Sequence, residues 1–211
     1  LIDLDPQGNA TMGSGVDKYG DVPTIYDLLI EDKPIDEVII KETSGEYHMI
    51  AANGDVTAAE VKLMELFARE VRLRNALEKI QDQYEFIFID CPPSLNMLTV
   101  NAMAAADSIL VPMQCEYYAL EGLTALMDTI TQLAKLVNPK LQVEDILNTM
   151  YDPRNRLAND VSEQLKQHFG DKVYRTVIPR NVRLAEAPSY GAPAIYYYRA
   201  SGGAKAYFAI A

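Results

Sequence analysis

The sequence predicts an α/β fold in which a mostly parallel sheet carries helices on both faces. Short apolar segments with strand character alternate with segments of helical periodicity, and that alternation is typical of parallel strands joined by helical crossovers. Two of the apolar segments, 1–4 and 85–90, run directly into carboxylates. Open parallel sheets bind ligands beyond the carboxyl ends of their strands, so these acidic ends are the first candidates for a site.

Length and composition favour one globular domain. The 211 residues are enough for a full core and contain no repeat or linker-like stretch, so we expect a single domain over 1–211. No apolar run reaches the roughly 18 residues that cross a bilayer. The two cysteines, Cys91 and Cys115, are not spaced as a metal-site pair and favour a reducing cytosol. The net charge of −11 argues against broad nucleic-acid binding by a monomer, but leaves room for a small basic patch doubled in a dimer.

The expected strands are short and end at turn residues. In the first one, Leu1, Ile2 and Leu4 are suited to burial, while Asp3 and Asp5 lie where the strand runs out into the crevice. The later strands are expected, on the same criteria, at 47–51, 85–90, 107–112, 143–150 and 173–178.

Periodicity and capping residues mark the helices. Thr24 to Asp27 form a capping box that opens a short helix ending near Ile30. The strongest periodicity predicts a helix over about 57–80. Its apolar face would consist of Val61, Met64, Phe67, Val71, Leu77 and Ile80. Further helices are expected to begin near Ser94, to cover 118–137 before Asn138-Pro139, and to cover 157–169 before Gly170.

The segment that ends at Asp90 has the pattern of a metal-binding strand. Five of the six residues before Asp90 are apolar or aromatic, which predicts a strand buried on both faces, and two prolines then end it. A buried strand that closes on Asp at the carboxyl edge is the Walker B arrangement, whose carboxylate holds Mg²⁺, usually through water. The alternative is an aspartate that only caps the helix starting near Ser94.

A second candidate is the loop over 177–189. It follows a strand and brings Pro179, Arg180, Asn181 and Arg183 into one turn. A proline face and an arginine plane are able to sandwich a flat base. A surface loop with ordinary arginines explains the same spacing equally well.

Five segments, taken together and in this order, resemble the ParA/Soj chromosome- and plasmid-partitioning ATPases, which are relatives of the MinD septum-site ATPases. They are LIDLDPQGNAT, FIFIDCPPSLNMLTVNAM, ADSILVPMQCEYYALEGL, TMYDPR and VIPRNVRLAEAPSYGAP, and the resemblance covers essentially the whole chain. It implies one deviant-Walker-A ATPase domain with a three-layer P-loop NTPase-like fold, and ATP and Mg²⁺ as cofactors.

The resemblance also implies roles for individual residues. Asp5 matches the carboxylate that orients the water attacking the γ-phosphate, Asp3 the carboxylate near the magnesium shell, and Asp90 the Walker B carboxylate. Phosphoryl transfer depends mainly on positioning and charge neutralisation, which suits such a small set of groups. The residues that match the nucleotide-binding loops are Pro179 and Arg180 against the adenine, with Met150 and Asp152 near base and ribose.

The family's DNA binding is non-specific, depends on ATP and is made by a homodimer. Arg154 and Arg183 stand at positions that resemble those contacts, and Arg156 and Lys205 are candidates to add to them. For any one of these side chains, a solvated surface charge is the slightly more economical interpretation. The other implied properties are a ParB/Spo0J-type partner that stimulates hydrolysis, a cytoplasmic, nucleoid-associated location, and no membrane attachment.

One feature of the family is not found in these residues. Members open with a strand and a Walker A loop that carries two lysines, whereas Gly8, Gly13 and Gly15 lie in a turn without lysine at the needed spacing. We therefore interpret 1–211 as a fragment or a trimmed chain that lacks the N-terminal strand and P-loop. As such it is expected to bind ATP weakly or not at all, and to be marginally stable or to self-associate along the exposed sheet edge.

Two other functions remain open. A MinD-like ATPase of septum placement would anchor to membranes through a C-terminal amphipathic helix, but residues 202–211 contain only Lys205 as a basic residue. A P-loop-less interaction module without ATPase activity is the second alternative.

Some residues are expected to be structural. Cys91 is more economically a small buried thiol than a nucleophile or cluster ligand. Tyr196 to Tyr198 are expected in a strand-like edge segment with one or two rings packed inward. We expect no metal at His48 or His168, and core positions for Met97, Met103 and Met113.

Overall fold

Two pairs of parallel strands organise the fold of the computed structural model, which describes residues 1–116 and 119–211. The strands are β1 (Ile2–Asp3) paired with β2 (Ile89–Asp90), and β3 (Ser108–Gln114) paired with β4 (Gln142–Thr149). Single parallel bridges join Ile2 to Ile50 beside the first pair, and Ile146 to Val173 beside the second. These pairings confirm the predicted α/β class with parallel strands. The single sheet that we predicted is wrong for the described residues, which form two two-stranded sheets, and the strands expected at 47–51 and 173–178 are present only as isolated bridges.

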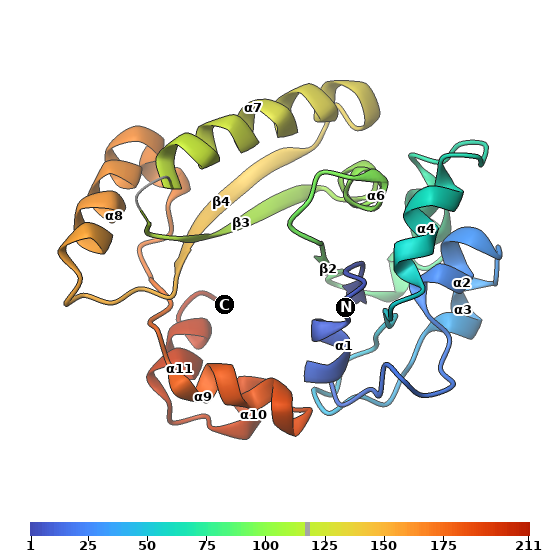
Figure 1. The fold of residues 1–211 in the computed structure, drawn as a ribbon, viewed down its shortest axis with the longest axis horizontal. Coiled ribbons are helices and arrows are strands. Elements are labelled where there is room, and N and C mark those ends of the chain that lie inside the picture. The colour runs from blue at the N-terminus through green and yellow to red at the C-terminus, as the bar shows by residue number, and fades with distance from the viewer. Residues whose placement is uncertain (117–118) are drawn as a thin grey trace.

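Short helices connect and cover the strands (Figure 1). They are α1 (Asn9–Gly13), α2 (Ile25–Ile30), α3 (Ile35–Val38), α4 (Val56–Leu63), α5 (Arg72–Leu77), α6 (Met97–Ala105), α7 (Ala119–Val137), α8 (Arg156–Phe169), α9 (Val182–Glu186), α10 (Ala194–Tyr197) and α11 (Gly202–Phe208). The 3₁₀ turns found in the described residues are η1 (Gln81–Gln83), η2 (Gly170–Lys172) and η3 (Ala187–Tyr190). None of the helices in the described ranges is long and apolar enough to cross a membrane.

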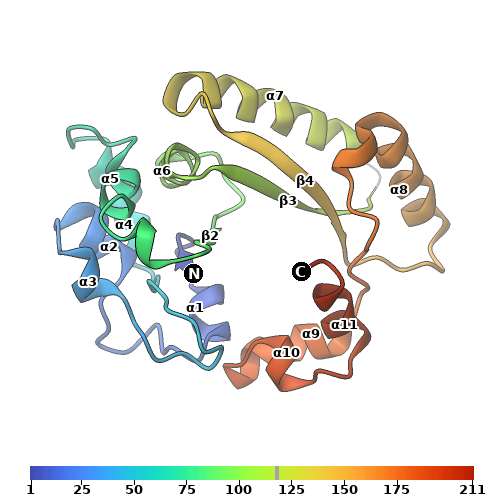
Figure 2. The same cartoon turned by 180° about the vertical axis from the view of Figure 1, so that it is seen from behind.

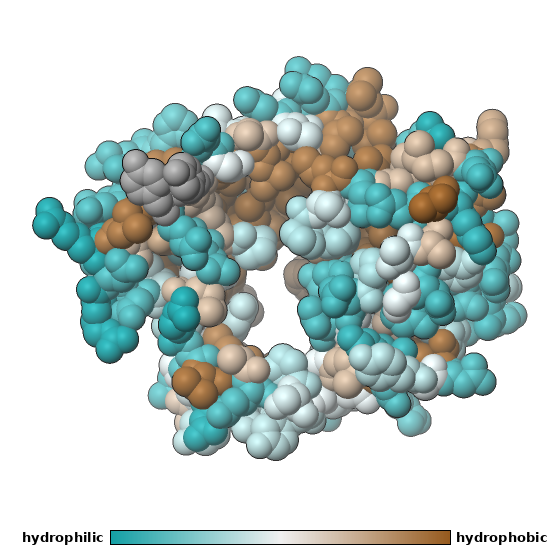
Figure 3. Space-filling view, in the orientation of Figure 1, coloured by the Kyte–Doolittle hydropathy of each residue, from teal (hydrophilic) through white to brown (hydrophobic). Residues whose placement is uncertain are grey.

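The elements surround a central opening. Helices α2 to α5 lie beside β1–β2, α7 runs along β3–β4 with α8 next to it, and α9 to α11 complete the ring (Figures 1 and 2). The space-filling view in Figure 3 shows that side chains do not fill this opening. Within the described residues, β2 pairs only with β1 and β3 only with β4.

The segment before Asp90 is therefore not the doubly buried strand that we predicted. Only Ile89 and Asp90 have strand pairing, and the Phe86 and Phe88 side chains are 71% and 65% exposed. The reason is that only one face of the segment is covered: Ile87 and Ile89 pack against the first core, whereas Phe86 and Phe88 project from the opposite face. The two phenylalanine rings instead stack on each other with centroids 6.4 Å apart.

Two separate cores correspond to the two sheets. The first surrounds β1 and includes Leu4, Leu29 and Leu98, whereas the second lies between β3–β4 and α8 and includes Ile146 and Leu165. A smaller cluster, in which Met103 of α6 lies in one group with Ile130 of α7, connects them. Burial of Met103 and Met113 confirms their core positions, and Met97 is partly buried.

The predicted helix over 57–80 is wrong as one helix. It is divided into α4 and α5, with Ala68 in the left-handed region at φ 51° between them. Asn101 of α6 fixes the second half, because its Oδ1 accepts a hydrogen bond from Leu73 N and its Nδ2 donates to Arg69 O. The predicted apolar face is consequently turned outward at its centre, where the exposed residues are Val61, Met64 and Phe67.

Most predicted helix boundaries are confirmed. The Thr24–Asp27 capping box is present, with Thr24 N donating to Asp27 Oδ2 at 2.7 Å, and α8 ends before Gly170 at φ +58°. The helix expected near Ser94 begins at Met97, with Asn96 as its cap. The helix expected over 118–137 begins at Ala119 as described here, and its first predicted residue lies outside the described residues.

The strand predicted for Tyr196 to Tyr198 is wrong, although one of the three rings, that of the half-buried Tyr197, packs on Tyr190. The backbone forms the short helix α10 rather than an edge strand, and Tyr196 and Tyr198 are exposed. A proline at 193 with extended backbone precedes the helix and provides its start.

Candidate functional site

Three carboxylates meet at the carboxyl end of β1 and β2. Asp3 and Asp90 are register partners in the parallel pair, and Leu4 N donates to Asp90 O at 2.9 Å just before the chain reaches Asp5. Because parallel strands end at the same edge, Asp5 and Asp90 follow the same rim of the sheet. We call Asp3, Asp5 and Asp90 the acidic rim.

Asp3 is fully buried and holds the loop that follows β1. Its Oδ2 accepts hydrogen bonds from Thr11 N at 2.9 Å and Thr11 Oγ1 at 2.8 Å, and its Oδ1 accepts one from Asp5 N at 3.0 Å. Desolvation raises the pKa of Asp3 despite these bonds. Its oxygens are thus committed to positioning the loop 5–11, and with it the carboxylate of Asp5.

The turn between Asp5 and α1 is tight. Gln7 N donates to Asp5 Oδ1 at 2.9 Å and Gly8 N donates to Asp5 O at 2.9 Å. Gly8 has φ +60°, and a Cβ there would lie 2.8 Å from Ala52 O, so only glycine fits this position without strain. The half-buried Asp5 keeps its second carboxylate oxygen for other partners.

Asp90 is the exposed member of the acidic rim. Desolvation, and then the negative charges of Asp3 and Asp5, raise the pKa of its carboxyl. Carboxylates that raise one another's pKa in this way favour a nearby cation. The donor set consists of oxygen atoms, which Mg²⁺ prefers, so the residues present fit a magnesium ion.

The protein alone offers few ligands for such an ion. Over residues 1–116 and 119–211 there is no group of three or more His, Cys, Asp or Glu side chains able to enclose a metal. Mg²⁺ commonly keeps several waters and binds through one or two carboxylates plus phosphate oxygens, so an incomplete protein shell is the expected one. For the same residues, His48 and His168 take part in no such group.

Cys91, next to Asp90, has the properties of an inert thiol. Desolvation, followed by the charge of Asp90, raises its pKa to about 12. A thiol with so high a pKa provides almost no thiolate at neutral pH.

A second group of candidate residues lies where β4 ends. Tyr151 and Pro179 form a parallel bridge, with Tyr151 N donating to Ile178 O and Arg180 N donating to Tyr151 O, both at 3.0 Å. The structure thus brings together the loops that carry Met150, Asp152, Pro179 and Arg180, the four residues that the resemblance assigns to the nucleotide. We call these four residues the loop group.

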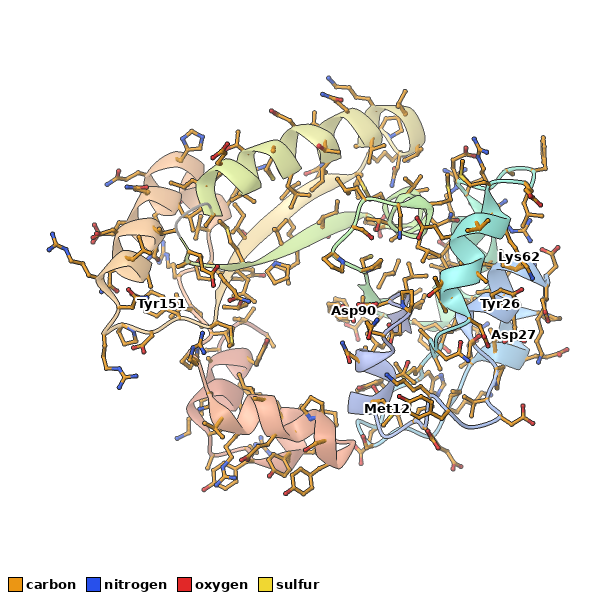
Figure 4. All side chains as sticks on the ribbon, in the orientation of Figure 1. Met12, Tyr26, Asp27, Lys62, Asp90 and Tyr151 are labelled. Atoms are coloured by element: carbon orange, nitrogen blue, oxygen red, sulfur yellow. The ribbon has the colours of Figure 1, made fainter. Side chains whose placement is uncertain are left out.

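Met150 adopts a backbone conformation that is rare for its residue type. Its φ is 52°, while its side chain is 43% exposed. A non-glycine residue in the left-handed region costs on the order of 1–3 kcal/mol, and such strain is concentrated at binding sites. In Figure 4, Tyr151 of this loop and Asp90 of the acidic rim lie on different sides of the opening.

The candidate DNA-binding arginines are exposed and paired with carboxylates. Arg154 makes a two-pronged contact with Asp152, through Nε at 3.0 Å and Nη2 at 2.8 Å, and this holds the pKa of Asp152 at about 2. Arg183 Nη1 donates to Glu186 Oε2 at 2.7 Å. The other two candidates are Arg156, whose Nε lies 3.9 Å from Asp160 Oδ2, and the exposed Lys205 of α11.

Charge is unevenly distributed along the chain. Residues 150–211 contain nine Lys and Arg against five Asp and Glu, whereas residues 1–149 contain ten against twenty-five. The segment with all four candidate cations therefore carries +4 in a chain of −11. This asymmetry can be read from the sequence, and it makes these four residues better candidates for DNA contacts than the net charge of the whole chain indicates.

Two contributors were not identified from the sequence. Thr11 binds Asp3 through both its backbone and its hydroxyl, and that hydroxyl also accepts from Ala52 N at 2.9 Å. Glu186 binds Arg183 from one turn further along α9. The (i, i+3) spacing was the available signal for Glu186, while nothing local indicates the contact between Thr11 and Asp3.

Comparison with known proteins identifies similar chains. A family model described as "AAA domain" matches residues 1–143. The sporulation initiation inhibitor protein Soj of Bacillus subtilis is 47% identical over 211 residues, which cover 100% of this chain and 83% of that protein. The chromosome partitioning protein ParA of Caulobacter vibrioides is 46% identical over 213 residues, covering 100% of this chain and 80% of that protein.

Among solved structures, a cobyrinic acid a,c-diamide synthase from Mycobacterium smegmatis with bound ATP analogue and magnesium superposes with a TM-score of 0.85. It is 32% identical, and the match covers 98% of this chain and 77% of that chain. The architecture described above is thus shared with a protein whose structure holds a nucleotide and Mg²⁺.

Proposed function

The chain belongs to the ParA/Soj family of chromosome-partitioning ATPases, and on that premise we propose that the protein, when the family's Walker A loop complements these residues, binds ATP with Mg²⁺ between the acidic rim and the loop group and hydrolyses it. The observation that carries the proposal is the register pairing of Asp3 with Asp90, which brings three carboxylates to the end of neighbouring parallel strands. The fold is the P-loop NTPase-like α/β fold, in which this edge is the phosphate side.

Each carboxylate has a different task in this proposal. Asp90, exposed at the rim, would hold Mg²⁺ through its waters, where the ion would supply positive charge next to the phosphate oxygens. Asp5 orients the water that attacks the γ-phosphate. Asp3 lies near the magnesium shell and acts through the loop, since both of its oxygens already accept hydrogen bonds from Thr11 and Asp5.

The loop group is the proposed site of the base and ribose. Pro179 and Arg180 pack on the adenine, while Met150 and Asp152 face the base and ribose. The acidic rim and the loop group belong to different sheets, which suits a ligand whose phosphates and base are at opposite ends. Strain at Met150 supports a binding role for this turn.

The proposed output is non-specific DNA binding by an ATP-dependent homodimer at the nucleoid. Arg154 and Arg183 make the main phosphate contacts, and Arg156 and Lys205 add to them. The charge of +4 over residues 150–211 supports this surface, and doubling it in a dimer strengthens it. A ParB/Spo0J-type protein is the proposed partner that stimulates hydrolysis.

The test is ATP turnover by the full-length protein with and without DNA and a ParB-type partner. We expect both to stimulate turnover, and Asp5→Ala to abolish the stimulated rate. Asp171→Ala, which removes an exposed carboxylate of η2, is the matched control and is expected to keep it. Stimulated turnover that survives Asp5→Ala would overturn the role of Asp5.

Co-sedimentation separates partitioning from membrane-based septum placement. The full-length protein is mixed with ATP and either duplex DNA or vesicles of anionic lipid. Partitioning predicts sedimentation with DNA alone, and with a smaller yield as salt rises. Sedimentation with the vesicles and not with DNA would overturn the proposal in favour of the septum-placement alternative.

A further inference from the structure

Arg183 is held in one orientation by its own chain. Its backbone N donates to the side chain of Asn181, the N-cap of α9, at 2.9 Å, so the start of the helix fixes the position of Arg183. Its Nη1 donates to Glu186 Oε2 at 2.7 Å, and the guanidinium lies 5.2 Å from the centre of the Tyr198 ring. One edge and one face of the guanidinium are therefore occupied.

Glu186 has a second hydrogen-bond donor besides Arg183. Tyr197 donates its hydroxyl hydrogen to Glu186 Oε2 at 3.3 Å, and the Tyr197 ring stacks on Tyr190 with centroids 4.7 Å apart. The tyrosine hydroxyl and the arginine therefore share one carboxylate oxygen, Oε2 of Glu186. The pKa of Arg183 is raised, mainly by its hydrogen bond to Glu186.

A carboxylate and a phosphate compete for the same donors. Both bind the guanidinium fork through charged oxygens, so a phosphate that binds the Nη1 edge of Arg183 must first displace Glu186. An exposed ion pair of this kind changes an affinity by only a few-fold, which is small enough for DNA to break and large enough to measure.

We propose that Glu186 is an internal competitor of DNA phosphate at Arg183 and sets the DNA affinity of the protein below what the arginine alone would give. The inference rests on the proposed function, because it assumes that Arg183 contacts DNA. Glu186 acts through Arg183 and is a positioning residue rather than a DNA contact. Glu186 lies three residues after Arg183 on the same short helix, so the fold of α9 itself places the carboxylate next to the guanidinium.

Arg154 and Asp152 show that the arrangement is not unique to α9. Arg154 is bound by Asp152 two residues earlier, in the two-pronged geometry described above. Asp152 belongs to the proposed nucleotide site, so a change there alters two functions at once. Glu186 lies outside that site and is the residue on which the competition is tested.

The experiment measures DNA binding by the full-length protein with ATP. Fluorescence anisotropy of a labelled random-sequence duplex is followed over a series of NaCl concentrations, for wild type, Glu186→Gln, Arg183→Ala and the double variant. Glutamine removes the negative charge and replaces one carboxylate oxygen by an NH₂ group, while its remaining oxygen can still accept from Tyr197 and, as a weaker neutral acceptor, from Arg183. Glu163→Gln removes one exposed charge from α8 and controls for the change in net charge.

Glu186→Gln is expected to bind DNA about two- to five-fold more tightly than wild type, the range that an exposed ion pair allows. The slope of log K against log salt should become steeper by up to about one, because one more cation is free to replace counterions on DNA. In the Arg183→Ala background the same substitution should have no more effect than Glu163→Gln.

The possible failures are distinct. Equal effects of Glu186→Gln in the presence and absence of Arg183 would overturn the competition while leaving DNA binding intact. Equal effects of Glu186→Gln and Glu163→Gln would also overturn the competition, because the gain in DNA affinity would then come from the change in net charge. Absence of DNA binding by wild type at low salt would instead overturn the proposed function.

Circular dichroism melts check that the variants fold. An unfolded Glu186→Gln variant would also count against the proposal, because Glu186 would then be needed for the structure itself.

Discussion

Thr11 donates two hydrogen bonds to one carboxylate oxygen of Asp3, one from its backbone N at 2.9 Å and one from its hydroxyl at 2.8 Å. The same hydroxyl accepts from Ala52 N at 2.9 Å. This one side chain therefore links the end of β1, the start of α1 and the segment after the Ile2–Ile50 bridge, which together position the acidic rim.

Thr11→Val is expected to destabilise the protein by about 1–3 kcal/mol, because it leaves a buried Asp3 oxygen and the Ala52 N–H with unmade hydrogen bonds. Thr11→Ser keeps the hydroxyl and is the matched control, with a much smaller loss. Urea unfolding followed by circular dichroism measures both. A Thr11→Val variant as stable as Thr11→Ser would contradict the role given to the hydroxyl.

The raised pKa of Asp90 predicts that its ionised carboxylate lowers the stability of the fold while serving the proposed magnesium site. A carboxyl whose pKa is raised on folding contributes least to stability when ionised, so its penalty is absent below the usual aspartate pKa of about 3.9 and grows as pH rises through the folded pKa. Asp90→Asn is therefore expected to raise the melting temperature at pH 7 and to leave it unchanged in strong acid.

The same Asp90→Asn variant should lose magnesium-dependent ATP turnover, because the neutral amide lacks the negative charge with which the carboxylate attracts Mg²⁺. Melting curves at pH 7 and at acid pH, together with turnover in excess Mg²⁺, measure both effects. A lower melting temperature at pH 7 would show that Asp90 is a stabilising residue rather than an electrostatically unfavourable one.

The close approach of Gly15 and Gly191 predicts a site that tolerates no side chain. Gly15 has φ +78°, and a Cβ there would lie 2.9 Å from Gly191 O, where α1 packs against η3. Gly15→Ala is expected to loosen the C-terminal helices from the N-terminal segment and to lower the melting temperature. Gly54→Ala is the control, since its Cβ would meet nothing within 4 Å.

Hydrogen exchange gives a second measurement for the same pair. Amides of α9 to α11 should exchange faster in Gly15→Ala than in wild type, and at the wild-type rate in Gly54→Ala. Unchanged protection in Gly15→Ala would mean that this contact does not hold the C-terminal helices.

Sequence reasoning predicted elements with strong local signals and missed those that depend on distant packing. The Thr24–Asp27 box and the Gly170 end of α8 are set by neighbouring residues, and both were correct. The break between α4 and α5 depends on Asn101, about thirty residues away, which no periodicity near Phe67 reveals.

The site shows the same division. That Asp5 and Asp90 share one rim follows from parallel pairing and was predicted. The exposure of Phe86 and Phe88 was not, because an apolar run specifies what a strand can bury and not whether a neighbour is there to bury it. Roles assigned to the loop group and the arginines remain predictions.

Gly122 of α7 offers a test of local propensity alone. It is exposed within a 19-residue helix, and a Cβ there would meet nothing within 4 Å. Gly122→Ala is expected to stabilise the protein by about 0.5–1 kcal/mol, because alanine loses less backbone entropy in a helix.

Cys91 should react slowly with thiol reagents despite being next to the proposed magnesium site. Its pKa of about 12 leaves very little thiolate at pH 8, and thiolate is the reacting species. We expect alkylation by iodoacetamide, followed by mass spectrometry, to be far slower at Cys91 in the folded protein than in guanidinium, where its pKa returns to about 8.5. Cys115→Ser removes the other thiol, so that the rate belongs to Cys91 alone. Rapid alkylation of the folded Cys115→Ser variant would show a reactive thiolate beside Asp90 and would reopen the interpretation of Cys91 as a nucleophile.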